Sequence, residues 1–456
     1  MTNSDKITII GAGLSGSLLA IYLAKRGLHV EVYERRPDMR KANISAGRSI
    51  NMAVSVRGIH ALKEVGLDKT ILQQAIPMKG RMLHSIEGEL SFHPYGKAEH
   101  EYINSISRGQ LNRVLMDEAE KQQVALHFNQ KCLGMDFRSS ELKLQNEETG
   151  TVANLAVNTV IGADGSASAI RADMSRVGRF NLSQQYLEHG YKELTIPPGP
   201  DSRFLLEKNA LHIWPRGAYM LIALPNLDGS FTCTLFFPFD GEFSFATLNN
   251  EKQVLDFFTS RFPDAVPLMP TLTEDFFANP TGSLATIKCS PWSVEDKALL
   301  LGDAAHAIVP FFGQGMNCCF EDCTYLNECI EKHGTDWRKV FAEIEKLRKV
   351  NSDTIADMAL ENFIEMRDSV ADEAFLLRKQ VEFALEEKFP DRFIPRYSMV
   401  SFHRIPYSVA YARGEIQERI LRELCQSITS VEELDWQKAE ALISEQLTRI
   451  SEEELD

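Results

Sequence analysis

Apolar and polar positions follow a strand–helix–strand pattern at the start of this chain. The run KITII at 6–10 predicts a short buried strand, LLAIYLAKRG predicts a helix, and HVEVYE predicts a second strand that ends at Glu34. This order is a βαβ unit, which places two parallel strands side by side. We therefore expect the chain to open with an α/β sheet.

Further strands are predicted in the middle of the chain, and helices towards its end. Alternating segments at 124–163 and 187–240 predict sheets, the second with an Asp228-Gly229 hairpin turn. A buried strand, KALLLGDAAH, begins at 297, and the pattern is helical from there onward. The β-rich middle therefore looks like an insertion, and the charged helical stretch from about 370 reads as an addition packed on the core.

Composition and charge narrow the class of partner. The chain has 456 residues, 44% of them hydrophobic and 25% charged, as in ordinary globular proteins with two or three domains. Lys and Arg total 49 against 64 Asp and Glu, a net charge of -15. This balance argues against nucleic acid, because phosphate backbones need cationic surfaces. An anionic ligand would need a local cation, so a buried Arg becomes a candidate.

The chain ends and the cysteines indicate a location. The start MTNSDKITIIGAG lacks a secretory signal, the end TRISEEELD is acidic, and no window approaches the roughly 18 apolar residues of a membrane helix. The eight cysteines show neither C-x-x-C nor zinc-finger spacing. We therefore expect a soluble, cytoplasmic protein with reduced thiols, no metal site and no membrane span.

A glycine motif follows the first strand. Gly11, Gly13 and Gly16 fit G-x-G-x-x-G at a helix start, where a pyrophosphate can approach backbone N–H groups. Glu34 follows about 20 residues later, where a carboxylate can accept hydrogen bonds from the ribose hydroxyl groups. The alternative is a tight strand–helix turn with no ligand.

Two later segments distinguish between the possible dinucleotides. They are IGADGSASAIR, with Asp164 and Gly165, and LLGDAAHAIVPFFGQGMN, with Gly302 and Asp303. In this order the three motifs resemble the flavoprotein aromatic hydroxylases, the family of p-hydroxybenzoate hydroxylase. The resemblance implies an α/β fold with a Rossmann-like FAD-binding domain of the glutathione reductase type. The expected ranges are 1–72, 99–180 and 285–370 for that discontinuous domain, 73–98 and 181–284 for an inserted β-sheet substrate domain, and 371–456 for a C-terminal helical segment.

The same resemblance assigns roles around tightly bound, non-covalent FAD. It places Asp164 near the pyrophosphate, Asp303 on the flavin's sugar portion, and Arg35 or Arg36 beside the adenosine. Arg108 would contact a flavin phosphate, although a surface salt bridge is an alternative. The backbone N–H groups at 313–317 lie where a helix could start and could stabilise charge on the reduced ring. The cofactor-contacting set is Gly11, Gly13, Leu14, Gly16, Glu34, Arg35, Arg36, Ala53, Arg108, Leu133, Asp164, Gly165, Asp303, Gly313, Gly315, Met316 and Asn317.

Several longer blocks resemble one branch of this family, the enzymes that hydroxylate L-kynurenine. These blocks are GRSINMAVSVRG at 47–58, IPMKGRMLH at 76–84, HPYG at 93–96, VPFFGQGMN at 309–317 and ENFIEMRD at 361–368. The resemblance implies that Arg81 and Tyr95 hold the substrate carboxylate, with Asn362 and Tyr397 at the same polar end. A guanidinium can clamp a carboxylate with two charge-assisted bonds. The alternatives are that Arg81 is a solvated loop cation, that Tyr95 is a capped turn aromatic, and that Asn362 belongs to a local hydrogen-bond network.

The aromatic end of the substrate needs an apolar slot. Leu211, Ile222, Leu224 and Phe236 lie in the β-rich insert, and the spacing of Ile222 and Leu224 puts those two on one sheet face. Ordinary core packing explains these residues equally well. The resemblance adds the following residues to the slot: Pro310 and Phe311 from the flavin side, and Met366, one helical turn from Asn362.

The implied reaction is hydroxylation of L-kynurenine to 3-hydroxykynurenine with NADPH and O2 through a C4a-hydroperoxyflavin. NADPH would bind transiently, because no second G-x-G-x-x-G with its own βαβ unit is present, and no side chain is assigned as a catalytic acid or base. Alternatives are a related flavin monooxygenase for another carboxylate-bearing aromatic substrate, and a non-catalytic flavin protein. A halogenase is disfavoured because W-x-W-x-I-P is absent. A homodimer is one option, and the C-terminal helices either cover the substrate site or only pack.

Overall fold

The structure is a computed structural model that describes residues 6–41, 51–366 and 373–451. Residues 47–50 and 367–368, which belong to two of the sequence blocks above, lie outside this description. The chain divides into two compact units. Unit 1 comprises Met1–Ala75, Ile106–Leu187 and Ala285–Ala356, and unit 2 comprises Ile76–Ser105, Glu188–Leu284 and Asp357–Asp456.

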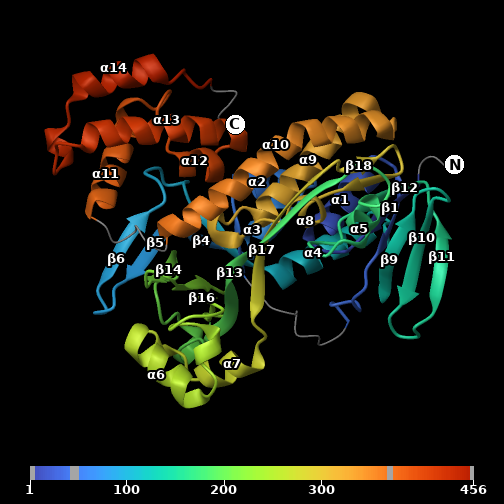
Figure 1. Ribbon diagram of the computed structural model, residues 1–456, viewed down its shortest axis with the longest axis horizontal. Helices are drawn as coiled ribbons and strands as arrows, with labels where there is room; N and C mark the ends of the chain where they lie inside the picture. The colour runs from blue at the N-terminus through green and yellow to red at the C-terminus, as the bar shows by residue number, and fades with distance from the viewer. Residues whose placement is uncertain (1–5, 42–50, 367–372, 452–456) are drawn as a thin grey trace. The chain divides into compact units, whose positions relative to one another are not determined.

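Unit 1 is built on a six-stranded sheet with the strands β1 (Lys6–Ile10), β2 (His29–Tyr33), β8 (Ala125–His127), β12 (Thr159–Gly162), β18 (Ser293–Val294) and β19 (Ala298–Leu300). The order is β18-β19-β12-β1-β2-β8, and all neighbours are parallel except β18 and β19 (Figure 1). These short apolar strands are largely buried, as helix-covered parallel strands are. Segments distant in sequence therefore meet in one sheet, and the predicted α/β fold class is confirmed.

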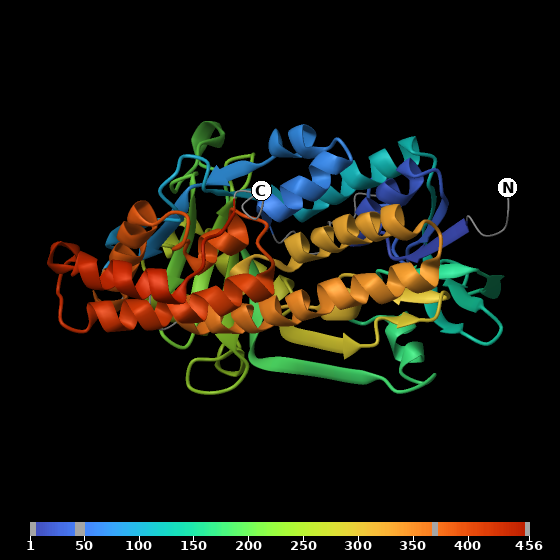
Figure 2. The ribbon, with the colours of Figure 1, turned by 90° about the horizontal axis from the view of Figure 1, so that it is seen from above.

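Helices and a smaller sheet complete unit 1. The helices are α1 (Leu14–Lys25), α2 (Val56–Glu64), α3 (Asp68–Leu72), α4 (Arg108–Lys121), α5 (Ala169–Met174), α8 (Asp303–His306), α9 (Gly315–His333) and the first part of α10 (Trp337–Ile364). The remaining strands are β3 (Asn51–Val54) and the antiparallel β9 (Gln130–Asp136), β10 (Glu141–Asn146) and β11 (Val152–Ala156). α9 and the first part of α10 run alongside each other (Figure 2).

Unit 2 is built on a seven-stranded sheet with the order β17-β13-β16-β15-β14-β5-β6. Its strands are β5 (Gly80–His84), β6 (Leu90–Pro94), β13 (Asn181–Ile196), β14 (Ala210–Pro215), β15 (Met220–Pro225), β16 (Phe231–Pro238) and β17 (Gly282–Ser290). Two short strands, β4 (Ile76–Met78) and β7 (Ile103–Ser107), pair with each other. The predicted hairpin turn at Asp228-Gly229 joins β15 to β16, where Gly229 has a φ of +88°.

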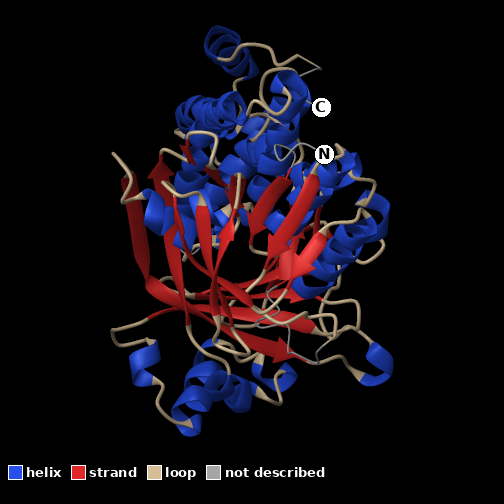
Figure 3. Ribbon diagram, turned by 90° about the vertical axis from the view of Figure 1, so that its right-hand side faces the viewer, coloured by secondary structure: helices blue, strands red, loops and turns tan. Residues whose placement is uncertain are grey.

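One face of this sheet carries the core of unit 2. Trp214, Leu221, Cys233, Leu235 and Phe237 alternate along β14, β15 and β16 and are fully buried. They pack in one hydrophobic cluster with residues of α6 (Glu251–Arg261) and α7 (Leu272–Ala278), which lie beside the strands (Figures 1 and 3). The period of two along a strand leaves the alternate residues to the opposite face.

The C-terminal part of unit 2 is helical, as the sequence predicted. Its helices are α11 (Glu373–Lys388), α12 (Arg396–Ser401), α13 (Tyr407–Cys425) and α14 (Trp436–Gln446). Val381, Phe393, Leu424 and Ile443 from this segment form a hydrophobic cluster of their own. Within the described ranges, no helix has both the length and the apolar character that crossing a bilayer requires.

A buried chain of hydrogen bonds joins β5 to β14 on the core face of the unit 2 sheet. His84 Nδ1 lies 2.6 Å from Asp264 Oδ2, and His84 Nε2 lies 2.9 Å from His212 Nδ1. His212 Nε2 donates to the Glu207 carbonyl at 2.8 Å, and Trp214 Nε1 donates to Asp264. Burial lowers the pKa of His212 to about 4, so its Nδ1 can only accept. His84 Nε2 then donates to His212, and His84 Nδ1 contacts the Asp264 carboxylate.

We expect Asp264→Asn to destabilise the fold at neutral pH. Burial acts to raise the pKa of Asp264, but His84 and Trp214 more than offset this, and the net shift is downward. The stability gained is therefore present above the ordinary aspartate pKa of about 3.9 and is lost as pH falls through the lower, folded value. Urea unfolding at pH 7 should show a loss of about 1–3 kcal/mol, shrinking towards pH 3.

Asp256→Asn provides the control for this measurement. Asp256 is 63% exposed and pairs with Lys252 on the outside of α6. Its replacement should change the free energy of unfolding by less than about 0.5 kcal/mol. Equal losses for the two variants, or a loss for Asp264→Asn that does not vary with pH, would contradict the stabilising role of the Asp264 carboxylate.

Candidate functional site

The glycine loop after β1 requires glycine at two of its three positions. Gly11 has a φ of +102°, and a Cβ there would lie 2.4 Å from the carbonyl oxygen of Ala163. A Cβ on Gly16 would lie 2.0 Å from the carbonyl oxygen of Gly11. Gly13 differs, because a Cβ there would meet nothing within 4 Å. The loop thus leaves open space at Gly13, at the start of α1, where the sequence predicts a pyrophosphate.

Glu34 at the end of β2 lies beside this loop. Its side chain is buried and accepts hydrogen bonds from the backbone N of Ala12 at 2.9 Å and from Arg36 Nε at 2.7 Å. Burial acts to raise the pKa of Glu34, but Arg36 and the backbone donors lower it below the ordinary value. The carboxylate is therefore ionised. Its Oε2 atom accepts only the hydrogen bond from Ala12 and can accept a second one. Arg35 and Arg36, which directly follow Glu34 in the chain, line a hollow of about 470 Å³.

Two buried polar atoms near the loop have no hydrogen-bond partner among the described residues: Asp164 Oδ1 and Asn112 Oδ1. The other oxygen of Asp164 accepts the backbone N of Ala169 at 2.7 Å, and Asn112 Nδ2 donates to the Ala12 carbonyl at 3.1 Å. Burial is the main cause that raises the pKa of Asp164. Because unpaired buried polar atoms are costly, their presence here fits a polar ligand in the cradle.

The start of α9 brings three predicted residues together. Asn317 is fully buried, and its Nδ2 donates to the carbonyls of Ala53 at 2.8 Å and Gly313 at 2.9 Å. Its Oδ1 accepts the backbone N of Ser55 at 3.0 Å. Gly313 has a φ of +68°, which lets the chain turn into the helix. β3 and the N-terminus of α9 are thereby fixed to each other.

The remaining predicted cofactor residues have the following places. Leu14 begins α1, and Met316 follows Gly315 in the first turn of α9; both Leu14 and Met316 are buried. Arg108 is exposed at the first position of α4. Leu133 on β9 is 39% exposed and lines a hollow of about 580 Å³. Gly165 has a φ of +81° just after Asp164, and the side chain of Asp303 at the start of α8 is exposed.

In unit 2, the guanidinium of Arg81 lies beside two phenol rings that stack on each other. The Arg81 guanidinium carbon is 5.6 Å from the ring centre of Tyr95 and 5.3 Å from that of Tyr397, and the two rings stack 5.2 Å apart. Arg81 Nε is buried without a hydrogen-bond partner, and no described carboxylate forms an ion pair with Arg81. Burial acts to lower the pKa of Arg81, but Tyr95, Tyr397 and Glu365 raise it overall. The Nε donor of this cation is therefore unused.

Strand register places the predicted apolar residues on the same sheet face as Arg81. Arg81 pairs with Leu211, and Met220 and Ile222 pair with Phe236 and Thr234. Directly paired residues point to the same side, as do residues two apart. Arg81, Leu211, Ile222, Leu224 and Phe236 therefore share the face opposite the α6 and α7 core. The alternative that these four apolar residues belong to that core does not agree with this register.

The last predicted substrate residues divide between the units. Asn362 and Met366 near the end of α10 are buried, and Asn362 Nδ2 lies 3.4 Å from Met366 Sδ. Pro310 and Phe311 belong to unit 1, in the turn Pro310–Phe312 before α9, where Phe311 is buried.

Sequence reasoning missed two polar residues that the structure places at these sites. Asn112, which braces the glycine loop, lies one helical turn after Arg108, and this spacing was the available signal. Lys379 on α11 lies close enough to Arg81 for the two charges to interact. Burial and Arg81 act to lower the pKa of Lys379, but Glu382 and Glu365 raise it overall. No sequence pattern connects position 379 to position 81.

We expect Gly13→Ala to separate folding from cofactor binding. The added methyl group meets no protein atom, and Gly13 has an ordinary φ of -73°, so the apoprotein should keep its melting temperature. The same methyl group would occupy the open space at the helix start, so FAD affinity should fall by about tenfold or more, a cost of roughly 1.4 kcal/mol. Flavin fluorescence quenching on apoprotein measures this affinity.

Gly178→Ala is the matched control. A Cβ at Gly178 likewise meets nothing within 4 Å, and the residue lies outside the predicted cofactor set. This variant should keep both the melting temperature and the FAD affinity. Unchanged FAD binding by Gly13→Ala would refute the predicted place of the pyrophosphate.

Comparison with known proteins agrees with this geometry. Residues 5–189 and 271–339 match the family described as FAD binding domain. The chain is 51% identical over 453 residues to kynurenine 3-monooxygenase of Myxococcus xanthus, covering 99% of this chain and 97% of the relative. It is 45% identical over 458 residues to the kynurenine 3-monooxygenase of Dictyostelium discoideum, covering 97% and 98%.

Solved structures show the same fold at low identity. 2-Methyl-3-hydroxypyridine-5-carboxylic acid oxygenase matches with a TM-score of 0.66 and 19% identity, covering 82% of this chain and 95% of that one. PqsL of Pseudomonas aeruginosa, in complex with 2-aminobenzoylacetate, matches with a TM-score of 0.63 and 17% identity, covering 79% and 98%. The shared fold, and the 51% identity that extends over nearly the whole chain, together show that this chain belongs to the kynurenine 3-monooxygenase family of FAD-dependent hydroxylases.

Proposed function

We propose that this protein hydroxylates L-kynurenine to 3-hydroxykynurenine with NADPH and O2, using FAD held by unit 1. The observation that carries the choice of substrate is Arg81, a partly buried residue whose buried Nε has no hydrogen-bond partner and which forms no ion pair among the described residues. An amino acid substrate supplies that carboxylate. The apolar residues on the same sheet face suit the aromatic ring of the substrate.

Arg81 would bind the carboxylate with charge-assisted hydrogen bonds, which are shorter and stronger than neutral ones. Burial is the main cause that raises the pKa values of Tyr95 and Tyr397, so both phenols stay protonated and can donate. Two neutral donors beside one cation orient a carboxylate without adding charge. Asn362, at the end of α10, would assist at the same polar end of the substrate.

The apolar side chains would hold the aromatic ring and exclude water. Leu224 and Phe236 are buried, whereas Leu211 and Ile222 are partly exposed on the face that Arg81 shares. The aniline nitrogen of kynurenine enriches the neighbouring ring carbon in electrons, so the substrate needs no strong protein base. The proposed task of these residues is to hold the substrate ring in one orientation.

The cofactor residues proposed above have complementary roles. Bound FAD, reduced by NADPH, would supply the activation of O2. Gly11, Gly13 and Gly16 would admit the pyrophosphate, Glu34 would accept the ribose hydroxyls, and Asp303 would bind the sugar portion. The backbone N–H groups at the start of α9 would stabilise negative charge on the ring. The eight free thiols fit the reducing cytoplasm, the compartment that we propose.

Product analysis tests the proposal directly. Purified holoenzyme incubated with L-kynurenine, NADPH and air should form 3-hydroxykynurenine in proportion to the NADPH consumed. Flavin reduction rates with NADPH and NADH would decide the nicotinamide preference. Consumption of NADPH that yields hydrogen peroxide and no hydroxylated product would reject the monooxygenase function with this substrate.

We expect Arg81→Met to weaken kynurenine binding through its carboxylate alone. Loss of a charge-assisted pair costs about 1.5–3 kcal/mol, roughly a 10- to 150-fold rise in Kd. The decarboxylated analogue of kynurenine should bind wild type and variant equally weakly, because it offers nothing to Arg81. Titration of the flavin absorbance measures both ligands, and Arg422→Met on the outside of α13 is the control, since its side chain is 70% exposed.

The analogue decides whether the effect is specific. If Arg81→Met weakened the binding of the decarboxylated analogue as much as that of kynurenine, Arg81 would act on the pocket in general. The proposed carboxylate contact would then be wrong, while FAD binding and product formation would still be tested by the assay above.

A further inference from the structure

Unit 1 contains a chain of buried charged residues that the proposed function does not use. Arg57 on α2, Glu321 and Asp322 on α9, Arg348 on α10 and His306 on α8 are each no more than 2% exposed. Removing charges from water is costly unless each one is paired. Five such groups in contact therefore call for an explanation.

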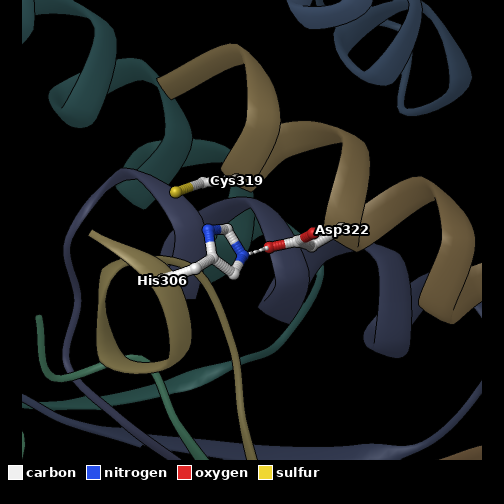
Figure 4. Close-up of side chains that lie close together, drawn as sticks. All are labelled: His306, Cys319 and Asp322. Carbon is white, nitrogen blue, oxygen red and sulfur yellow. Dashed lines mark hydrogen bonds and ion pairs between the residues drawn. The ribbon is translucent and has the colours of Figure 1, made fainter. Parts of the chain in front are cut away.

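The pairing runs continuously from α2 to α8. Arg57 Nη1 donates to Glu321 Oε1 at 2.6 Å, and Arg348 Nη1 donates to Glu321 Oε2 at 2.6 Å. Arg348 Nε donates to Asp322 Oδ1 at 2.7 Å, and His306 Nε2 lies 2.6 Å from Asp322 Oδ2. Figure 4 shows that the His306 ring from α8 points at Asp322 on α9.

Asp322 holds both ends of the turn that presents Asp303. Its Oδ2 atom accepts the backbone N of Gly302 at 3.3 Å as well as the ring of His306. These two contacts bracket the short helix α8, whose first residue is Asp303. The turn starts in an uncommon backbone conformation, with Gly302 at a φ of +62°, so an anchor on each side fixes its path.

A metal site is the competing interpretation of this cluster. Ligand atoms of His306, Cys319 and Asp322 lie within 4.8 Å of one another (Figure 4). Both oxygens of Asp322 already accept hydrogen bonds, one of them from the Arg348 cation, which would repel a metal ion. Burial is the main cause that raises the pKa of the Cys319 thiol, which keeps it protonated. The cluster is therefore better described as an ion-pair clamp than as a metal site.

We propose that His306 and Asp322 are positioning residues for FAD: by clamping the 302–306 turn, they hold the Asp303 carboxylate where the cofactor binds. This inference rests on the proposed FAD site. Cys319 Sγ lies 3.7 Å from Asp303 Oδ1, so the clamp and the proposed cofactor ligand are one side chain apart. Arg348 on α10 pairs with Asp322 and Glu321, and Arg57 on α2 pairs with Glu321, so the carboxylates of α9 are balanced from both neighbouring helices.

The charge state of His306 agrees with this geometry. Burial acts to lower its pKa, but Asp322 and Cys318 raise it well above the ordinary value. The imidazolium donates to Asp322 through Nε2, and Cys318 Sγ lies 4.0 Å from Nδ1. Gln at this position can place an amide donor near the site of Nε2, whereas Ala leaves Asp322 without its donor from α8.

The test compares FAD affinity across four variants of the full chain, measured on apoprotein by flavin fluorescence quenching. His306→Ala and Asp322→Asn should raise the FAD Kd by about tenfold or more, or roughly 1.4 kcal/mol. His306→Gln should raise it by less than about threefold, because the hydrogen bond to Asp322 is restored. Asp264→Asn, which breaks the buried His–Asp pair of unit 2, should lower the melting temperature without changing the FAD Kd.

Each alternative result overturns the inference. A folded His306→Ala variant with wild-type FAD affinity would show that the clamp does not position the cofactor site. Equal losses for His306→Ala and His306→Gln would show that the hydrogen bond to Asp322 is not what matters, and an equal loss for Asp264→Asn would indicate general destabilisation. If Asp322→Asn does not fold, the two His306 variants decide, since they leave the Arg348–Asp322 pair intact. Wild-type apoprotein that does not bind FAD at all would instead reject the proposed function.

Discussion

The structure depends on the groups that stabilise guanidinium side chains away from water. Arg57 and Arg348 in unit 1 are neutralised by Glu321 and Asp322, so that charge is balanced inside the protein. Arg81 in unit 2 contacts two aromatic rings and feels the charge of Glu365, but it forms no ion pair among the described residues. A cation buried in this way is stabilised when an anion arrives, because cation–π contacts recover only part of the lost hydration. One kind of side chain therefore serves as scaffold in one unit and as receptor in the other.

The two faces of the unit 2 sheet have different roles: one packs in the hydrophobic core, and the other carries the proposed binding residues. Residues that alternate along β14, β15 and β16 either enter the aromatic core with α6 and α7 or join the face of Arg81. β5 does both within four residues, because Arg81 and His84 point to opposite faces. The rigid side of the strand thereby supports its binding side.

Local patterns predicted what local geometry determines. The βαβ opening, the glycine loop and the shared face of Ile222 and Leu224 follow from short spacings, and the structure has each of them. The stacking of Tyr95 on Tyr397 joins positions about 300 residues apart, and only the resemblance to a known family had paired them. The His306–Asp322 pair was not foreseen, because two neighbouring carboxylates on α9 look like an ordinary solvated helix face. Burial decides that case, and burial is a property of the whole fold.

The last eighty residues of the chain form more than a removable tail. Their helices enclose a hydrophobic cluster that includes Val381, Phe393 and Ile443, and α12 also carries Tyr397 against Arg81. A stop codon or proteolytic cut near position 375 would therefore strip one aromatic wall from the guanidinium. Partial deletions beyond that point would expose the apolar side chains of this cluster to water. Natural shortening of this segment should be rare, and reporter fusions are better joined after its final helix than within it.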